Sequence, residues 1–333
     1  MSVLTTPITV EPLLQSLYEP ICEEMTQAER ILRDEMSSEH AYVDELVRYG
    51  VLLGGKRLRP ALLLLVAKAV GHVTPEHLTL AAVVEMIHTA TLVHDDVLDD
   101  AETRRHLATV NSRWDNKAGV LLGDFLFTHA FYLASTLNST WACRVIGLAT
   151  NRVCEGEMRQ KGSVGDFDLN ENEYLDIISA KTAELCACCC ELGARYAGAS
   201  TEQVAHMASF GRELGIAFQI ADDILDVTGD EQTTGKSLGT DVAQQKPTLP
   251  IIRLLQCASA AEREQAIAVL QGDATQRMSE LRPLLDRHEA ITYARKKALE
   301  YAHRAQHHLE VLPCSTARDM LVAMASFVVA RSQ

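Results

Sequence analysis

The sequence predicts an all-α protein, a single large helical bundle around a central apolar cavity. The chain has 333 residues, of which 47% are hydrophobic, and this is enough for an extensive core. Aromatic residues make up only 5%, whereas Ala, Leu and Glu are plentiful, a composition that favours helices. Apolar residues recur at helical spacing, and no convincing two-residue alternation marks a strand.

The helical patterns follow one another with mostly short connections. They cover residues 11–35, 38–53, 60–72, 75–100, 115–137, 140–161, 171–198, 201–228, 246–258, 261–271, 274–288, 290–310 and 315–331. No Pro- or Ser-rich linker divides the chain, and no unit of about 20–50 residues recurs. We therefore expect one domain over residues 1–333, with residues 1–10 as a flexible N-terminal tail.

Composition argues against several classes of function. The net charge of −14 at pH 7 disfavours a general affinity for nucleic acid. The N-terminus lacks the features of a secretory signal, and the apolar stretches are shorter than the roughly 20 residues of a membrane span. We expect a soluble, cytoplasmic protein whose apolar product could be delivered to a membrane. The four thiols between Cys186 and Cys190 are expected to be buried core residues rather than metal ligands.

Four aspartates end the apolar segment 75–100. On a helix Asp95 and Asp99 stack on one face, and Asp96 and Asp100 form a second stacked pair. These carboxylates repel one another, and the C-terminal end of a helix already carries negative partial charge. Several oxygen ligands of this kind suit Mg²⁺ that is bound together with phosphate oxygens. A solvated acidic helix end is the alternative, and it would be the better explanation of one isolated copy.

A second copy of this pattern favours a metal site over a solvated helix end. Asp222, Asp223 and Asp226 follow Gln219 at the end of another largely apolar segment. Two copies, both at the C-terminal ends of helices that are expected to be buried, make solvated helix ends an improbable explanation. The two ends could face each other across one cavity mouth.

A local basic cluster is conspicuous in this acidic chain. The segment Gly54–Pro60 holds Lys56, Arg57 and Arg59 in a tight loop between two predicted helices. Guanidinium groups and nearby backbone N–H groups suit a diphosphate. An ordinary charged turn is the alternative.

Further candidates flank these clusters. His88 lies two helical turns before Asp95 on the same face, where it is either a core residue or a donor to phosphate. Arg104 and Arg105 either pair with the aspartates before them or bind phosphate. Lys181 interrupts an apolar helix and needs an anionic partner there.

Two more lysines, Lys236 and Lys246, lie in the polar stretch after the second acidic segment. We expect them to be mobile cations that close over phosphates. The run Gly235-Lys236-Ser237 is not a P-loop, because Asp230 stands where that motif requires glycine and no strand precedes it.

Together these residues resemble the trans-isoprenyl diphosphate synthases, also called polyprenyl synthetases, of the long-chain type. Gly54–Pro60 matches that family's Gly-Gly-Lys-Arg-x-Arg-Pro motif, Asp95–Asp99 its first aspartate-rich motif and Gln219–Asp226 its second. The likeness covers nearly the whole chain. The chain departs from the family pattern in two places: His106 and Ala108 stand where the family usually has Gly and Pro after the first aspartate motif, and Gln245 stands where Gly commonly precedes the lysine.

The resemblance implies a Mg²⁺-dependent, head-to-tail condensation of isopentenyl diphosphate with an allylic diphosphate, such as farnesyl or geranylgeranyl diphosphate, through an allylic carbocation. It also implies a homodimer, and three Mg²⁺ ions held by Asp95, Asp99 and Asp222. The implied catalytic residues are Asp95, Asp96, Asp99, Lys181, Asp222, Asp223 and Lys236. The implied substrate-binding residues are Lys56, Arg57, Arg59, His88, Arg104, Arg105, Thr182, Gln219 and Lys246, of which Lys56, Arg59, His88 and Arg105 would hold isopentenyl diphosphate.

The helix before Asp95 also bears on product length. A growing tail would extend along it, and each upstream turn adds about 5.4 Å of depth. Ala90 and Thr91, one turn in, are small where an aromatic side chain would block growth early, so we predict a product of about C30 to C45. Candidate floor residues are Ile87, Val84, Phe127, Phe131 and Tyr132, for which plain core packing is an equal alternative.

Other functions would share parts of this pattern. A short-chain geranylgeranyl or farnesyl diphosphate synthase would differ in product length. A terpene cyclase or a head-to-head condensing enzyme would not need the loop from Lys56 to Arg59. A non-catalytic subunit of a heteromeric synthase is disfavoured by the intact aspartates of both motifs.

Overall fold

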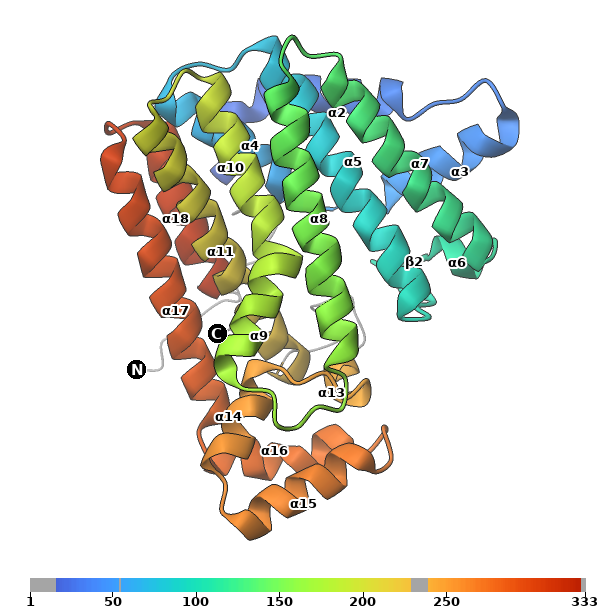
Figure 1. The fold of residues 1–333 in the computed structure, drawn as a ribbon, viewed down its shortest axis with the longest axis vertical. Helices are drawn as coiled ribbons and strands as arrows, with labels where there is room; N and C mark the ends of the chain where they lie inside the picture. Colours follow the sequence, from blue (N-terminus) through green and yellow to red (C-terminus); the bar gives the residue numbers. More distant parts are fainter. Residues whose placement is uncertain (1–15, 54, 229–238, 331–333) are drawn as a thin grey trace, which may run out of the picture.

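The computed structural model describes residues 16–53, 55–228 and 239–330. Long helices run side by side in a bundle, and shorter helices lie across one end of it (Figure 1). In chain order the elements are η1 (Glu19–Ile21), α2 (Cys22–Glu35), α3 (Ala41–Leu52), α4 (Leu58–Val70), α5 (Pro75–Leu98), β1 (Thr103–Arg104), β2 (Leu107–Ala108), α6 (Val110–Arg113), α7 (Asn116–Ser135), α8 (Thr140–Gly162), α9 (Glu171–Ile178), η2 (Ser179–Ala183), α10 (Glu184–Tyr196), α11 (Thr201–Thr228), α13 (Thr240–Ala243), α14 (Leu249–Cys257), α15 (Ala260–Gln271), α16 (Arg277–Arg287), α17 (Ala290–His308), η3 (Leu309–Val311) and α18 (Thr316–Ala330). The predicted all-α fold is confirmed.

Helix α5 is buried on nearly every side, as its apolar sequence predicts. Thr74 precedes it and forms a capping box with His77, while Pro75 begins its first turn. The helix packs against α2, α4 and α7 and ends at Leu98. Its buried faces hold its last turn, which carries Asp95 and Asp96, in a fixed position relative to the bundle.

The second acidic helix, α11, packs against α10 and α17. Gly211 allows a close approach, because a Cβ there would lie 2.5 Å from the carbonyl oxygen of Cys186. The four thiols between Cys186 and Cys190 on α10 are buried, as predicted. In Figure 1 both α5 and α11 descend, so that their acidic C-terminal ends lie on the same side of the bundle.

Two local features differ from the sequence prediction. The pattern over 171–198 forms α9, a π-helical turn (η2) and α10 instead of one continuous helix. The residues after α5 form a two-stranded hairpin in which Thr103 pairs with Ala108 and Arg104 with Leu107. Both features are too short to produce a periodic pattern, and both lie at the acidic ends of the bundle.

Within the described residues, α7 is the one helix whose length and composition would allow it to cross a membrane. In its most apolar 18-residue window, 44% of the residues are buried inside the molecule, and core helices of soluble proteins pass the same test. Large apolar side chains nevertheless remain exposed on it, notably Leu121 and Tyr132.

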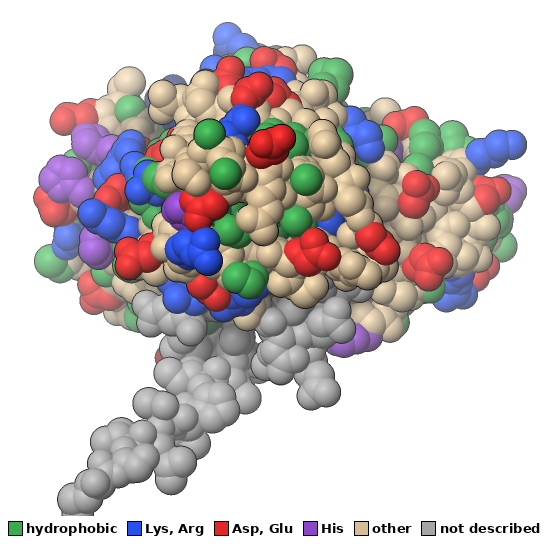
Figure 2. Space-filling model, turned by 90° about the horizontal axis from the view of Figure 1, so that it is seen from below, with side chains coloured by type: hydrophobic (Ala, Val, Ile, Leu, Met, Phe, Trp, Pro, Cys, Tyr) green, Lys and Arg blue, Asp and Glu red, His purple; other side chains and the backbone are tan. Residues whose placement is uncertain are grey.

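Figure 2 shows the molecule from below, at the lower end of the bundle in Figure 1. On the face that Figure 2 shows, acidic and basic side chains are interspersed with hydrophobic ones. The short helices α13, α14, α15 and α16 lie at this end of the bundle in Figure 1.

Candidate functional site

The two Asp-Asp pairs have the same internal arrangement. Asp96 on α5 and Asp223 on α11, the second aspartate of each pair, are buried. Asp95 and Asp222, the first of each pair, are half-buried. In both helices, therefore, one carboxylate is directed into the protein and its neighbour stays closer to solvent. The sequence placed all four among the catalytic residues and did not separate them.

Asp96 is held by the hairpin that follows α5. Nε of Arg104 donates to both Asp96 carboxylate oxygens at 2.9 and 3.0 Å, and Nη2 lies 2.8 Å from Oδ1. Burial raises the pKa of Asp96, and the bond from Arg104 opposes that rise. The hairpin thus returns a guanidinium to the end of α5. Of the aspartates before the hairpin, Arg104 pairs with Asp96.

Asp95 lies in a group of charged side chains that includes Lys181. Burial raises the pKa of Asp95 to about 6, with Lys181 opposing the rise and Glu157 and Asp99 adding to it. Lys181 has the anionic partner that its burial requires: its Nζ lies 2.6 Å from Glu157 and donates to Gln160 at 2.8 Å. Glu157 and Gln160 are one turn apart on α8, and sequence reasoning missed both.

The second acidic end is organised by hydrogen bonds from neutral groups. Asp223 accepts from the Tyr174 hydroxyl at 2.6 Å and from Gln219 at 2.8 Å. Thr182 in turn donates to Gln219 at 2.8 Å. Burial raises the pKa of Asp223, and Asp241 raises it further. Two predicted substrate-binding residues, Thr182 and Gln219, thus belong to one network with the second motif, and Tyr174 is an addition that the sequence did not indicate.

The segment after α11 links the two acidic ends. Asp226 accepts from the backbone N–H groups of Thr240 and Asp241 at 3.2 and 3.1 Å. Nζ of Lys246 lies 3.6 Å from Asp99 at the end of α5 and 3.6 Å from Asp241. Lys246 therefore connects the first motif to the surroundings of the second. Lys236, which we also predicted here, lies outside the described residues.

The basic loop lies beside the middle of α5. Burial lowers the pKa of His88 well below its ordinary value, and Arg59, Arg105, Arg104 and Arg57 lower it further, in that order. The imidazole is therefore neutral and surrounded by guanidinium groups. Nε of Arg59 is buried without a hydrogen-bond partner among the described residues. This orphaned donor, in an environment of excess positive charge, is suited to an anion.

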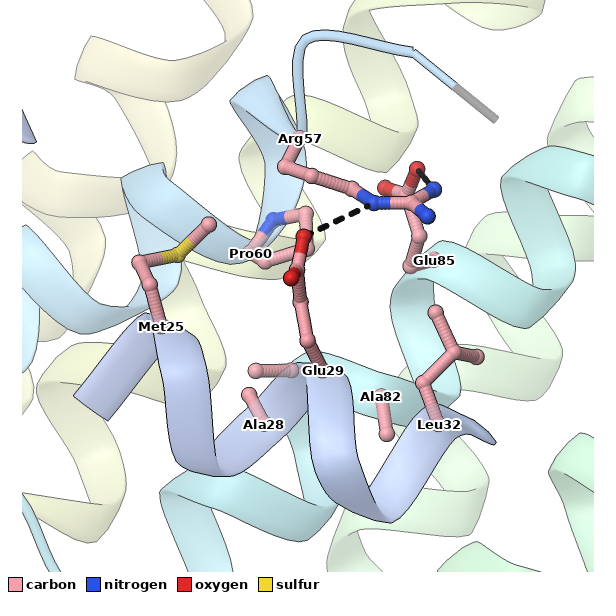
Figure 3. Close-up of a pocket in the computed structure, with 9 residues that line it drawn as sticks. Met25, Ala28, Glu29, Leu32, Arg57, Pro60, Ala82 and Glu85 are labelled. Atoms are coloured by element: carbon pink, nitrogen blue, oxygen red, sulfur yellow. Dashed lines mark hydrogen bonds and ion pairs between the residues drawn. The ribbon is translucent and has the colours of Figure 1, made fainter. Parts of the chain in front are cut away.

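Arg57 has a different place from its neighbours. Its Nη1 donates to the buried carboxylate of Glu85 at 2.7 Å, and its Nε lies 3.5 Å from Glu29 (Figure 3). The loop is also fixed by Tyr18, whose hydroxyl donates to the carbonyl oxygen of Lys56 at 2.8 Å. The structure thus engages Arg57 within the protein, and its predicted role in substrate binding stays a prediction.

Arg105 approaches the same loop from the hairpin. Its Nη1 donates to the carbonyl oxygen of Leu53 at 3.4 Å. A Cβ on Gly55 would lie 2.0 Å from Nη2 of Arg105, so a glycine at this position allows the guanidinium to lie against the loop backbone. The structure brings Lys56, Arg59, His88 and Arg105 to one region, and the family resemblance implies that these four residues bind one diphosphate.

The residues predicted to limit product length lie on α5 and α7, which pack against each other. Ala90, Ile87 and Val84 are buried, and Thr91, Phe127 and Phe131 are half-buried. Tyr132 is 63% exposed, which does not fit a place on the floor of an internal cavity.

The carboxylate groups suit a hard divalent cation in chemistry but do not enclose one. In the described part of the chain, no three His, Cys, Asp or Glu side chains are grouped so that they could hold a metal ion. Mg²⁺ commonly binds through one or two carboxylates, with substrate phosphates and water completing its octahedron. The half-buried Asp95, whose charge is disfavoured by burial and by neighbouring carboxylates, fits that mode.

Comparisons with known proteins agree with this geometry. Residues 40–287 match the family model described as polyprenyl synthetase. An octaprenyl diphosphate synthase of Escherichia coli (strain K12) is 35% identical over 322 residues, 96% of this chain and 99% of the relative.

Two solved structures have closely similar folds. A decaprenyl diphosphate synthase from Rhodobacter capsulatus superposes with a TM-score of 0.89 at 37% identity, over 96% of this chain and 99% of that one. A polyprenyl synthase from Caulobacter crescentus CB15, complexed with calcium and isoprenyl diphosphate, gives a TM-score of 0.90 at 35% identity, over 96% and 98% of the two chains.

Proposed function

The chain belongs to the polyprenyl synthetase family, and from this premise we propose that its acidic helix ends and its basic loop are the two halves of one prenyl-transfer site. The protein is a prenyltransferase, a trans-polyprenyl diphosphate synthase. The acidic half would bind the allylic diphosphate and the basic half isopentenyl diphosphate. The observation that carries this division is the distribution of charge along α5: guanidinium groups surround His88, whereas the carboxylates of Asp99 and Glu157 lie near Asp95 together with Lys181.

We propose that Asp95, Asp99 and Asp222 hold Mg²⁺, with three ions when substrate is bound. Asp95 is half-buried near Asp99 and Glu157. Burial raises its pKa and these two carboxylates add to the rise, so a divalent cation would favour the charged form of Asp95. When bound, the ions supply electrostatic stabilisation of the diphosphate leaving group. Lys181, Thr182 and Gln219 adjoin these carboxylates and would orient the same diphosphate, with Lys236 and Lys246 closing over it.

The basic half would orient the second substrate. Lys56, Arg59 and Arg105 would bind the isopentenyl diphosphate oxygens, and the neutral His88 would donate one hydrogen bond. The allylic C1–O bond then breaks, and its electron pair leaves with the diphosphate. The isopentenyl double bond supplies the electrons of the new carbon–carbon bond, and the departing diphosphate accepts the proton whose loss restores a double bond. The apolar faces of α5 and α7 would exclude water from the carbocation.

The product tail would extend along α5, away from Asp95. Ala90 and Thr91 leave room where a large side chain would stop the chain early, and Ile87 and Phe131 are candidates for the floor. We propose a product of about C30 to C45, because each further helical turn adds about 5.4 Å of depth.

We also propose that the protein is a homodimer. Leu121 and Tyr132 are 65% and 63% exposed and lie on one face of α7, three turns apart. Lys117 and Asp124 also lie exposed on this helix, and charges of this kind disfavour burial in a bilayer. A second copy of the chain is therefore the occupant that suits this face.

The function is tested by incubating the purified protein with farnesyl diphosphate, labelled isopentenyl diphosphate and Mg²⁺, and measuring the mass of the products. We expect products of about C30 or longer, and we expect Asp95→Ala to lower the rate by roughly 10²-fold or more, as the loss of one electrostatic stabiliser does elsewhere. Asp286→Ala is the control, since Asp286 pairs with Arg282 on α16. A dominant C15 or C20 product would contradict the length, and activity that survives Asp95→Ala would contradict the metal role.

A further inference from the structure

Glu85 is a buried carboxylate in the middle of α5, between the buried N-terminal turns and the acidic end. Its side chain is only 2% exposed. Oε1 accepts a hydrogen bond from Nη1 of Arg57 at 2.7 Å, while Oε2 is buried with no hydrogen-bond partner among the described residues. A buried charge is costly unless a counter-charge compensates it, and Arg57 is the cation in contact. The two residues therefore depend on each other.

Arg57 is the point at which the basic loop is attached to the bundle. Its backbone is left-handed, with φ of 53°, and it directly precedes the first turn of α4. For a residue other than glycine this conformation costs about 1–2 kcal/mol. The guanidinium, only 15% exposed, spans from Glu85 on α5 to Glu29 on α2, as Figure 3 shows. The ion pairs thus hold a strained residue between Lys56 and Arg59.

The four arginines near His88 differ in whether they pair with a carboxylate. Arg57 is paired with Glu85, and Arg104 is paired with Asp96. The buried Nε of Arg59 has no hydrogen-bond partner among the described residues, and Arg105 donates to a backbone carbonyl. Two of the four guanidinium groups are thus paired with carboxylates inside the protein, and the other two would be suited to an anionic ligand.

We infer that Glu85 is a positioning residue for isopentenyl diphosphate: through Arg57 it holds the loop 56–60 in the conformation that presents Lys56 and Arg59 to the substrate. This inference rests on the proposed function. Without the carboxylate, Arg57 loses its buried partner and is repelled by the neighbouring guanidinium groups, so the loop shifts. The allylic diphosphate, at the acidic end of α5, would be unaffected.

The test is Glu85→Gln, which keeps the size of the side chain and removes its charge. We expect the KM for isopentenyl diphosphate to rise about ten-fold, equivalent to about 1.4 kcal/mol. The KM for farnesyl diphosphate and kcat should stay within about two-fold of the wild-type values. A residue that affects only the binding of isopentenyl diphosphate changes the KM for that substrate alone. A general loss of folding would instead lower kcat and the melting temperature without this split.

Glu24→Gln is the matched control. Glu24 lies on α2 and pairs with Lys68 in the last turn of α4, so this variant removes another partly buried ion pair between helices. Neither KM should change in this variant beyond about two-fold, since Lys68 lies at the other end of α4 from Arg57.

Arg57→Met provides an independent variant should Glu85→Gln fail to fold. It should raise the same KM, and the double variant should raise it no further than the larger single effect, because residues that act through one contact are not additive. An unchanged KM in folded Glu85→Gln, or fully additive effects, would overturn the inference. If the wild-type protein does not consume isopentenyl diphosphate at all, the proposed function fails and not merely the role of Glu85.

Discussion

His106 and Gln245, two of the departures from the family pattern that the sequence resembles, both have a left-handed backbone. Their φ angles are 65° and 56°. His106 is the second residue of the two-residue turn between β1 and β2, and Arg105, the first, has φ of 53°. Such turns favour glycine, because only glycine takes both positive angles without strain. The departures in sequence thus keep the backbone conformation and add strain to it.

Replacing His106 by glycine should therefore stabilise the protein. We expect His106→Gly to raise the free energy of unfolding by about 1 kcal/mol, the size of the strain relieved in an exposed turn. Gln245→Gly is the comparison: its side chain donates to the carbonyl oxygen of Leu270 at 2.8 Å, so glycine would lose that bond and the net change should be near zero. Urea unfolding of the three proteins measures both values. A less stable His106→Gly protein would show that the turn is not strained.

At the scale of elements, the π-helical turn η2 decides where Lys181 and Thr182 lie. Glycines of two neighbouring helices contact it from both sides. A Cβ on Gly156 of α8 would lie 2.4 Å from the backbone nitrogen of Lys181, and one on Gly215 of α11 would lie 2.5 Å from Cα of Ala183. Because these are backbone contacts, no side-chain rotation could relieve them. The glycines thus set the depth at which Lys181 meets Glu157.

Gly156→Ala should disturb this turn and with it the reaction. We expect a loss of about 1–3 kcal/mol in stability from overpacking and a fall in kcat of at least about ten-fold, since a displacement of 1 Å at a substrate-positioning group can cost more than that. Gly147→Ala, on the same helix, is the control, because the nearest atom to its new Cβ is 3.8 Å away. Thermal unfolding and steady-state rates compare the two. Equal behaviour of the variants would contradict the role of the close contact.

At the scale of the whole molecule, the two sides of α7 have different surroundings. One side packs against α5 along the proposed path of the product, and the other carries the exposed Leu121 and Tyr132. If two copies meet on this second side, the partner covers the helix that borders the product path and supports it from outside. That residues 1–333 form one domain stays a prediction.

Charge on the exposed side of α7 should separate the two copies. We expect the wild-type protein to sediment as a dimer and the double variant Leu121→Glu/Tyr132→Glu to sediment as a monomer, because two buried carboxylates per copy would face each other. Leu299→Glu, which places a carboxylate at a residue 38% exposed on α17, is the control and should stay dimeric. A monomeric wild type would contradict the homodimer, and a dimeric double variant would contradict this interface.

Much of the fold and of the chemistry is encoded locally and could be predicted from the sequence. Helical periodicity and the absence of alternating patterns identified the bundle, since the burial of one face is a property of neighbouring turns. The two aspartate motifs and the loop from Lys56 to Arg59 predict a site for metal ions and diphosphates, because the types of residue limit the ligands they can bind, and that site stays a proposal. The buried thiols of α10 followed from their apolar surroundings in the sequence.

The tertiary structure alone decided which of these charged residues are paired inside the protein and which stay closer to solvent. Asp96 and Asp223 turn inward to Arg104 and Tyr174, and Arg57 turns inward to Glu85. Tyr174 and Asp223 are separated by 49 residues, and Arg57 and Glu85 by 28. Adjacent residues of one type look alike in a sequence, and only the packing of segments distant in the chain brings a buried partner to one of them and leaves its neighbour closer to solvent.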